Sequence, residues 1–315
     1  MRRLRRLSAL ILALVLVLAF TALAEERADR YDQVFDATQD AGKLTARFLK
    51  LTTRSDDKSG DSTIITSPDG KVMVVDAGNP STFLDIDNAL KALGITEIDY
   101  LVSSHPHVDH VGSFAQLIYA YDVGAVYATE VEYPTSHYHN YMQALEETST
   151  PLVILAEGDT FMFGEHVLVE IFHPAPGIEY YEGYPDSSTQ FINNLSLLMK
   201  LTYGDSSFLF AGDLYTAAER DIATRYGEGL KSGVLKVPHH GAGTSSSRPF
   251  REAVSARVAV MMSDAIEELR VYRNYSNAGA DTYITSIDGA VMVSTPGDGE
   301  YTVISQFDRV GGFLN

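Results

Sequence analysis

The chain has 315 residues, 45% of them hydrophobic, and contains no cysteine. That length and content suffice for one large core or two small ones, and the lack of cysteine excludes disulfides and thiolate metal sites. The formal net charge of −18 disfavours tight, non-specific binding to nucleic acid, because such binding depends on Lys and Arg neutralising phosphates.

Residues 1–24 are typical of a signal peptide. Four arginines within the first six residues precede an apolar stretch over residues 9–20, and Ala22-Leu23-Ala24 fits the small-x-small cleavage pattern. We expect cleavage after Ala24 and secretion. The alternative is an uncleaved signal that anchors the protein to the outer face of the membrane. Cleavage would remove four positive charges and leave a net charge of about −22.

The remainder is expected to be a polar arm over residues 25–42 and one α/β domain over residues 43–310, with helices covering both faces. Strands are expected at 46–52, 62–66, 71–75, 99–103, 124–128, 153–155, 161–163 and 167–172, then at 195–201, 207–210, 234–237, 258–262, 282–285, 290–295 and 301–305. Helices are expected at 83–93, 111–121, 216–226 and 250–254, with another within 129–150.

Residues of metal-binding types follow four of these strands. They are Asp76 after the third strand, the segment His105–His110 after the fourth, Asp213 after residues 207–210, and His239-His240 after residues 234–237. Because ligands just past the ends of buried strands gather on one rim of a sheet, we expect these side chains to lie together.

The segment His105-Pro106-His107-Val108-Asp109-His110 is the strongest of these signals. Three imidazoles and one carboxylate within six residues would need several polar partners at once if they only filled a core. A metal supplies one partner for all of them, and this ligand set suits Zn, Mn or Fe. The pattern therefore predicts a metal centre.

These residues resemble the metallo-β-lactamase superfamily, and within it the hydrolase domain of ComEC competence proteins and their stand-alone relatives. The resemblance covers about residues 43–310. The segments that carry it are Gly60-Asp61-Ser62, Pro68-Asp69-Gly70, Val74–Gly78, Ser104–Gly112, Asn193–Leu197, Ala211–Leu214 and Leu235–Gly241, with a fainter match over Ala278–Val293.

The resemblance implies an αββα sandwich with two divalent metal ions, Zn or Mn, at one edge. By position it implies His105 and His107 on one ion, Asp109 and His110 on the other, Asp213 bridging both, His239 completing the second site and Asp76 orienting a ligand from behind. Asp109 would also orient the attacking hydroxide.

The sequence departs from the common family pattern at two places. The region that often carries a further His has Asn193 and Asn194 instead, which favours a harder ion such as Mn. ComEC-like chains usually have a His-Pro near the end that could supply a ligand or a proton donor, but no His follows His240 here, so we expect His240 to act as the acid instead. His173 fits either a further metal ligand or a structural role.

These features predict a secreted two-metal hydrolase, a phosphodiesterase or nuclease that uses a metal-bound hydroxide. The acidity favours a small phosphodiester or a short single strand as substrate, without stable duplex binding. The alternatives are a metallo-hydrolase of a small ester, amide or lactone, including β-lactams, and a non-catalytic binding module of the same fold.

Overall fold

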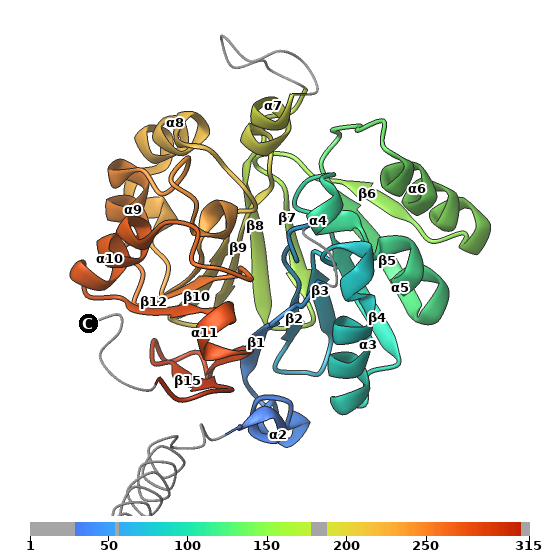
Figure 1. The fold of residues 1–315 in the computed structure, drawn as a ribbon, viewed down its shortest axis with the longest axis horizontal. Coiled ribbons are helices and arrows are strands. Elements are labelled where there is room, and N and C mark those ends of the chain that lie inside the picture. The colour runs from blue at the N-terminus through green and yellow to red at the C-terminus, as the bar shows by residue number, and fades with distance from the viewer. Residues whose placement is uncertain (1–28, 54–56, 178–187, 310–315) are drawn as a thin grey trace, which may run out of the picture.

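The computed structural model describes residues 29–53, 57–177 and 188–309. The expected signal peptide and its cleavage site lie outside the described residues. Two β-sheets lie at the centre of the molecule and helices flank them on both sides (Figure 1). This arrangement confirms the αββα sandwich. No helix in the three described stretches is long and apolar enough to cross a membrane.

The first sheet has eight strands in the order β15-β14-β1-β2-β3-β4-β5-β6. Its strands are β1 (Leu44–Phe48), β2 (Thr63–Thr66), β3 (Val72–Val75), β4 (Glu97–Val102), β5 (Asp122–Ala128), β6 (Leu152–Ile154), β14 (Val291–Thr295) and β15 (Thr302–Ser305). β3 to β6 run parallel. The expected hairpin is present, since β2 pairs antiparallel with β3.

The second sheet has seven strands in the order β13-β12-β11-β10-β9-β8-β7. They are β7 (Thr160–Phe163), β8 (Val167–His173), β9 (Leu198–Tyr203), β10 (Ser206–Phe210), β11 (Val234–Lys236), β12 (Val258–Met261) and β13 (Asp281–Ile284). β10 to β13 run parallel. Each sheet therefore has a parallel half, and the loops after parallel strands are the usual place for a site in an α/β fold.

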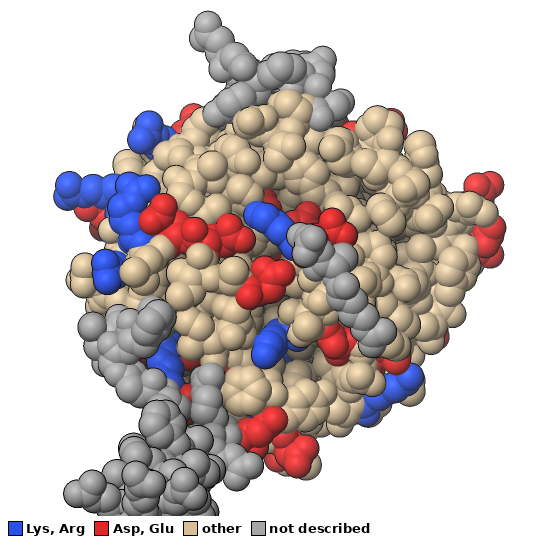
Figure 2. All heavy atoms as spheres, in the orientation of Figure 1, with Lys and Arg blue, Asp and Glu red and all other residues tan. Residues whose placement is uncertain are grey.

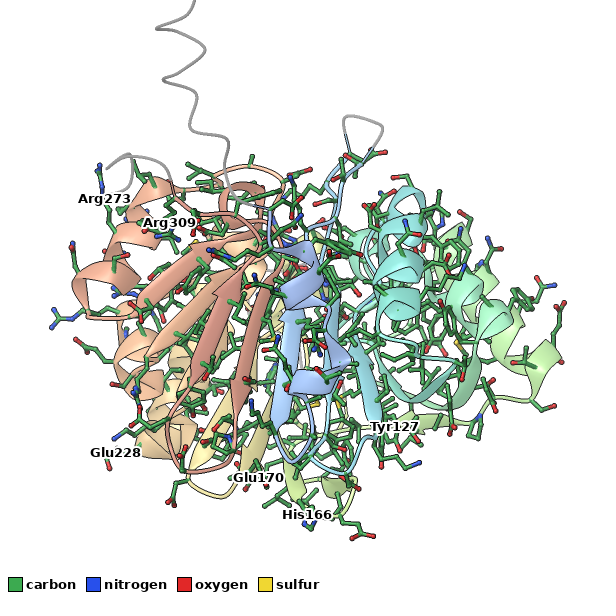
Figure 3. All side chains as sticks on the ribbon, turned by 90° about the horizontal axis from the view of Figure 1, so that it is seen from below. Tyr127, His166, Glu170, Glu228, Arg273 and Arg309 are labelled. Carbon is green, nitrogen blue, oxygen red and sulfur yellow. The ribbon has the colours of Figure 1, made fainter. Side chains whose placement is uncertain are left out.

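Most of the helices cover the outer faces of the sheets, whereas α7 (Thr189–Asn194) lies at the ends of the strands (Figure 1). The other helices are α2 (Tyr31–Val34), α3 (Phe83–Ala92), α4 (Val108–Val111), α5 (Phe114–Ala120), α6 (Ser136–Thr148), α8 (Thr216–Tyr226), α9 (Arg248–Val254), α10 (Leu269–Asn277) and α11 (Thr285–Asp288). Short 3₁₀ turns are η1 (Ala37–Gln39), η2 (Pro80–Thr82), η3 (Gly227–Leu230) and η4 (Pro238–Gly241). Viewed from below, the sheets lie between the two helical layers, with Arg273 and Arg309 at one corner and Tyr127 at the other side (Figure 3).

The sandwich is held by three apolar layers. Alternate strand residues such as Ile65, Met73 and Val75 join the cluster shared by both sheets. Their neighbours Ile64 and Val74 pack instead with the helices on the outer face of the first sheet. A third cluster joins the second sheet to α8, α9 and α10. Because successive strand residues point to opposite faces, each strand places apolar side chains on both faces of its sheet. This fixes the register of the strands and therefore the positions of the loops at their ends.

Four elements differ clearly from the sequence expectation. The strand expected over residues 46–52 is β1, which ends at Phe48. The helix expected over residues 111–121 is split into α4 and α5 near Gly112, where a Cβ would lie 2.4 Å from Pro80 Cδ. Residues 195–197 precede β9 instead of forming it, because α7 extends to Asn194. α10 was missed because its polar sequence, LRVYRNYSN, buries only one narrow stripe, Val271, Tyr272 and Tyr275.

Candidate metal centre

Four parallel strands deliver the centre's residues. Asp76 follows β3, the segment His105–His110 follows β4, Asp213 follows β10, and His239-His240 follows β11. The two sheets meet at this rim, so loops from both reach the same place. His105, His110, Asp213 and His240 are each at most 3% exposed. Buried imidazoles and carboxylates at this density need either each other or a cation as partners.

The histidines converge on one carboxylate oxygen. Asp213 Oδ2 lies 3.3 Å from His110 Nε2, 3.3 Å from His240 Nε2, 3.8 Å from His239 Nε2 and 3.9 Å from His105 Nε2. His107 Nδ1 lies 3.0 Å from His105 Nε2, and Asp109 Oδ2 lies 3.4 Å from His240 Nε2. All six residues expected to bind metal therefore lie in one cluster, with Asp213 at its centre.

The cluster fits divalent metal ions. The buried Nε2 atoms of His110 and His240 have no hydrogen-bond partner among the described residues. An orphaned buried nitrogen costs free energy that a bound cation would recover. Asp61, His110, Asp213 and His240 each offer an atom within 4.8 Å of the others, as a metal-binding group requires. Imidazole nitrogen and carboxylate oxygen suit Zn or Mn.

Asp76 orients His110 from behind. Its Oδ2 lies 2.9 Å from His110 Nδ1, and its Oδ1 accepts the backbone N–H of Ser104 at 2.7 Å. An acceptor on Nδ1 leaves the lone pair of the neutral ring on Nε2, facing Asp213. This carboxylate–histidine pairing is the usual support of a metal-binding imidazole.

Asp61 and Lys236 also belong to the centre, although the sequence assigned them no role. Lys236 is 3% exposed, forms an ion pair with Asp61, and donates to the carbonyl of Gly212 at 2.9 Å. Its Nζ lies 3.6 Å from Asp213 Oδ1. Three oxygens therefore compensate the buried ammonium. Both residues fall in segments that carry the family resemblance, and this was the feature of the sequence that could have indicated their role in the centre.

The charged groups of the cluster shift one another's pKa values. Burial alone would lower the pKa of His110, but the carboxylates of Asp213, Asp76 and Asp109 raise it to about 10. Burial would raise the pKa of Asp213, but the neighbouring His240 and His110 hold it well below its usual range. Burial lowers the pKa of His239 to about 4. The carboxylates around His110 thus favour positive charge at this place, which a bound cation would also supply.

A cleft of about 720 Å³ opens onto the cluster. His107, Asp109, Asp213 and His239 lie at its lining, together with Tyr133 and His137 from the segment before α6 and its first turn. His137 is thus on a helix at the cleft wall. The volume falls within the range of small-molecule sites, roughly 300–1,000 Å³. The centre is therefore accessible to a substrate of modest size.

The two asparagines have different surroundings. Asn194 donates to the carbonyl of Gln190 at 2.8 Å and accepts the N–H of Ala218 at 3.3 Å, so its amide is used within the fold. Asn193 lines the cleft, and its buried Oδ1 has no hydrogen-bond partner among the described residues. His173 lies behind them, with Nε2 2.7 Å from the carbonyl of Asn194. Asn193 is thus the amide that faces the centre, and His173 supports its segment.

Comparison with known proteins gives concordant matches. The model of the Metallo-beta-lactamase superfamily matches residues 55–179. The chain is 33% identical over 111 residues to the uncharacterized protein YcaI of Escherichia coli strain K12, covering 35% of this chain and 14% of that protein. It is 28% identical over 175 residues to competence protein ComA of Neisseria gonorrhoeae, covering 56% of this chain and 21% of that protein. The chain therefore spans about a fifth or less of these two relatives.

Two further matches extend over more of the related chain. A UPF0173 metal-dependent hydrolase of Staphylococcus aureus strain MRSA252 is 26% identical over 203 residues, covering 58% of this chain and 82% of that protein. The metallo-beta-lactamase fold protein YhfI of Bacillus subtilis superposes with a TM-score of 0.50 at 11% identity, covering 80% of this chain and 99% of that chain.

The two-sheet sandwich with a histidine–aspartate cluster at its rim is the architecture of the metallo-β-lactamase fold. Residues 55–179 match the model of the Metallo-beta-lactamase superfamily, and the similarity to competence protein ComA agrees with the resemblance found in the sequence.

Proposed function

We propose that the protein is a two-metal phosphodiesterase that acts on small phosphodiesters or short single strands of nucleic acid. The observation that carries the proposal is the convergence of four imidazole Nε2 atoms within 3.3–3.9 Å of Asp213 Oδ2, at the base of an open cleft. Similarity to competence protein ComA supports a phosphodiester substrate.

The residues divide the work of hydrolysis between them. Two divalent ions in the cluster would lower the pKa of a water and clamp the oxygens of the scissile group. Asp109 lines the cleft, so its carboxylate can accept a hydrogen bond from the attacking water and orient it. Asn193 and His239 line the same cleft, where their side chains can contact phosphoryl oxygens.

Charge favours a small substrate over a long polyanion. Among the described residues that line the cleft, Lys58 is the only Lys or Arg, and its Nζ is 3.8 Å from Glu267. Figure 2 shows Asp and Glu gathered near the middle of one face, with Lys and Arg in separate small groups. A duplex would contact this acidic surface, whereas a short diester feels mainly the local field of the ions. Tyr133 adds an aromatic surface on which a base can stack.

The experiment is an activity panel on metal-loaded protein. Purified protein with Mn or Zn is assayed against p-nitrophenyl phosphodiesters, short single-stranded DNA, long duplex DNA and a chromogenic β-lactam. We expect the highest kcat/KM on small diesters or short strands. Turnover of the β-lactam with no diester cleavage would replace the proposal with its lactam alternative. Failure of the protein to take up any divalent ion would refute a metal-dependent role.

We further propose that the protein is secreted, that residues 1–24 are removed, and that residues 25–42 form an arm before the hydrolase domain. Support comes from the arginines, the apolar stretch and the Ala22-Leu23-Ala24 site. N-terminal sequencing of protein recovered from the culture medium should begin near Glu25. Recovery with Met1 intact, in the membrane fraction, would favour the anchored alternative.

A further inference from the structure

Two adjacent histidines enter the centre differently. His239 and His240 follow Pro238 at the end of β11, and both adopt left-handed backbone conformations, with φ of 49° and 55°. This turn separates their rings, whose centroids lie 5.8 Å apart at 50°. The sequence expectation assigned His239 to the metal and His240 to proton transfer. The contacts of the four ring nitrogens favour the reverse.

The distances around His240 match one metal site. Its Nε2 lies 3.3 Å from Asp213 Oδ2 and 3.4 Å from Asp109 Oδ2. His110 Nε2 is also 3.3 Å from Asp213 Oδ2. Ligand atoms on a tetrahedral ion with bonds of about 2.0–2.1 Å lie roughly 3.3–3.4 Å apart. His239 Nε2 lies farther from Asp213 Oδ2, at 3.8 Å, and is not part of the metal-binding group formed by Asp61, His110, Asp213 and His240.

The other nitrogen of His240 is fixed by acceptors. Its Nδ1 lies 3.0 Å from Asp61 Oδ1 and 3.0 Å from the carbonyl of Met262. A carboxylate and a carbonyl can only accept, so Nδ1 carries the proton. In the neutral ring the lone pair is then on Nε2, which faces Asp109 and Asp213. His110 has the same arrangement with Asp76, so each of these imidazoles has a carboxylate behind it.

Asp61 is held in this supporting position by Lys236. One oxygen of Asp61 faces His240, and the other forms the ion pair with Lys236. Asp61 is 2% exposed and Lys236 is 3% exposed, so water does not weaken the pair. Both carboxylate oxygens are thus engaged. Asp61 is close enough to the centre to bind an ion, yet its contacts direct it to His240 instead.

His239 has the contacts of a residue that faces substrate. It lines the cleft, its side chain is 13% exposed, and its Nδ1 lies 2.6 Å from the hydroxyl of Thr244. A hydroxyl can donate or accept, so it imposes no fixed tautomer on the ring. The centroid of the Tyr215 ring lies 5.0 Å from that of the His239 ring, so the two rings pack together and this contact brings no charge to the imidazole.

We infer that His240 completes the second metal site with Asp109, His110 and Asp213, that Asp61 and Lys236 are its positioning residues, and that His239 contacts the substrate. The inference rests on the proposed two-metal function and assigns the roles within it.

The test compares metal binding by His239→Gln, His240→Gln and Asp61→Asn. Metal-free protein is titrated with Co(II), and the visible absorption spectrum and the bound metal per chain are recorded. Thermal unfolding of each variant confirms folding, and the exposed His139→Gln serves as the matched control. We expect His240→Gln to bind one fewer ion than wild type. His239→Gln should bind two with an unchanged spectrum, yet lose most of its kcat on a diester.

Asp61→Asn supplies a second measurement should His240→Gln fail to fold. Loss of a supporting carboxylate typically weakens metal affinity about 10–100-fold, while two ions should still bind at saturation. Loss of one ion in His239→Gln, or two ions retained with unchanged affinity in both His240→Gln and Asp61→Asn, would overturn the assignment and leave the proposed function standing. Wild-type protein that binds no Co(II) would instead overturn the proposed function, and the assignment with it.

Discussion

Gly60, in the loop before β2, packs against the metal-binding segment, and its replacement by Ala should displace residues of the metal centre. A Cβ on Gly60 would lie 1.7 Å from the carbonyl oxygen of Asp109, and real Cβ contacts essentially never fall below 3.0 Å. The two segments would therefore have to separate by at least about 1.3 Å. Asp61, which hydrogen-bonds through its N–H to that same oxygen at 3.1 Å, would move with Gly60.

The cost of Gly60→Ala has two parts. The φ of +78° adds about 1–2 kcal/mol for a residue with a Cβ, and the forced displacement adds about 1–3 kcal/mol more. A 1 Å shift at a catalytic centre lowers the rate by about 100-fold. Urea unfolding should therefore show a loss of roughly 2–5 kcal/mol, with diester hydrolysis reduced about 100-fold.

Gly42→Ala is the matched control, because Gly42 has a φ of +71° and a Cβ added there would meet nothing within 4 Å. It should show the backbone penalty alone, about 1–2 kcal/mol, with normal metal content. If Gly60→Ala loses no more stability than Gly42→Ala and keeps full activity, the close packing of residue 60 on the metal-binding segment is not what holds the centre.

Three more outcomes follow from the same structure. Burial lowers the pKa of His173 to about 4, so its contribution to stability is complete above about pH 6.5 and is lost as the pH falls toward 4. Between pH 6.5 and 5 the unfolding free energy of wild type should decrease more steeply than that of His173→Gln, by up to about 1.4 kcal/mol per pH unit. Equal slopes for wild type and His173→Gln would show that His173 does not titrate in this way. Glu219 is buried and accepts hydrogen bonds from the N–H groups of Ser246 and Ser247 at 2.6 Å each. Glu219→Ala should therefore lower the free energy of unfolding in urea by about 1–3 kcal/mol. A loss of unfolding free energy no larger than that of the exposed Glu252→Ala would contradict the role of these bonds. Moderate salt should raise duplex DNA binding or leave it unchanged in fluorescence anisotropy, whereas a steep loss of affinity with salt would reveal a basic surface.

The fold was largely predictable because most of its strands are short apolar runs bounded by turn residues. The hairpin of β2 and β3 flanks Pro68-Asp69-Gly70, and α8 spans the expected residues 216–226. The misses have local causes. α10 and α7 are short helices of mixed polarity, and each is stabilised by burying a few side chains on partners that are distant in sequence, which periodicity does not record.

The centre was less predictable than the fold. A dense motif such as His105–His110 is recognisable within six residues, but Asp61 and Lys236 meet only because strands from both sheets end at one rim. Sequence also could not separate Asn193 from Asn194, or His239 from His240. Each pair consists of adjacent residues of the same type, and only their backbone directions decide which side chain reaches the cleft.

In the proposed centre, Asp213 would hold two divalent metal ions together. The most direct test is the divalent metal content of wild type and Asp213→Asn, measured by mass spectrometry alongside diester hydrolysis, with the exposed Asp298→Asn as control. We expect two ions per chain in wild type and in the control. In Asp213→Asn we expect reduced occupancy of both sites and little hydrolysis. Two ions and full activity in Asp213→Asn would show that Asp213 is not needed to hold the metal ions.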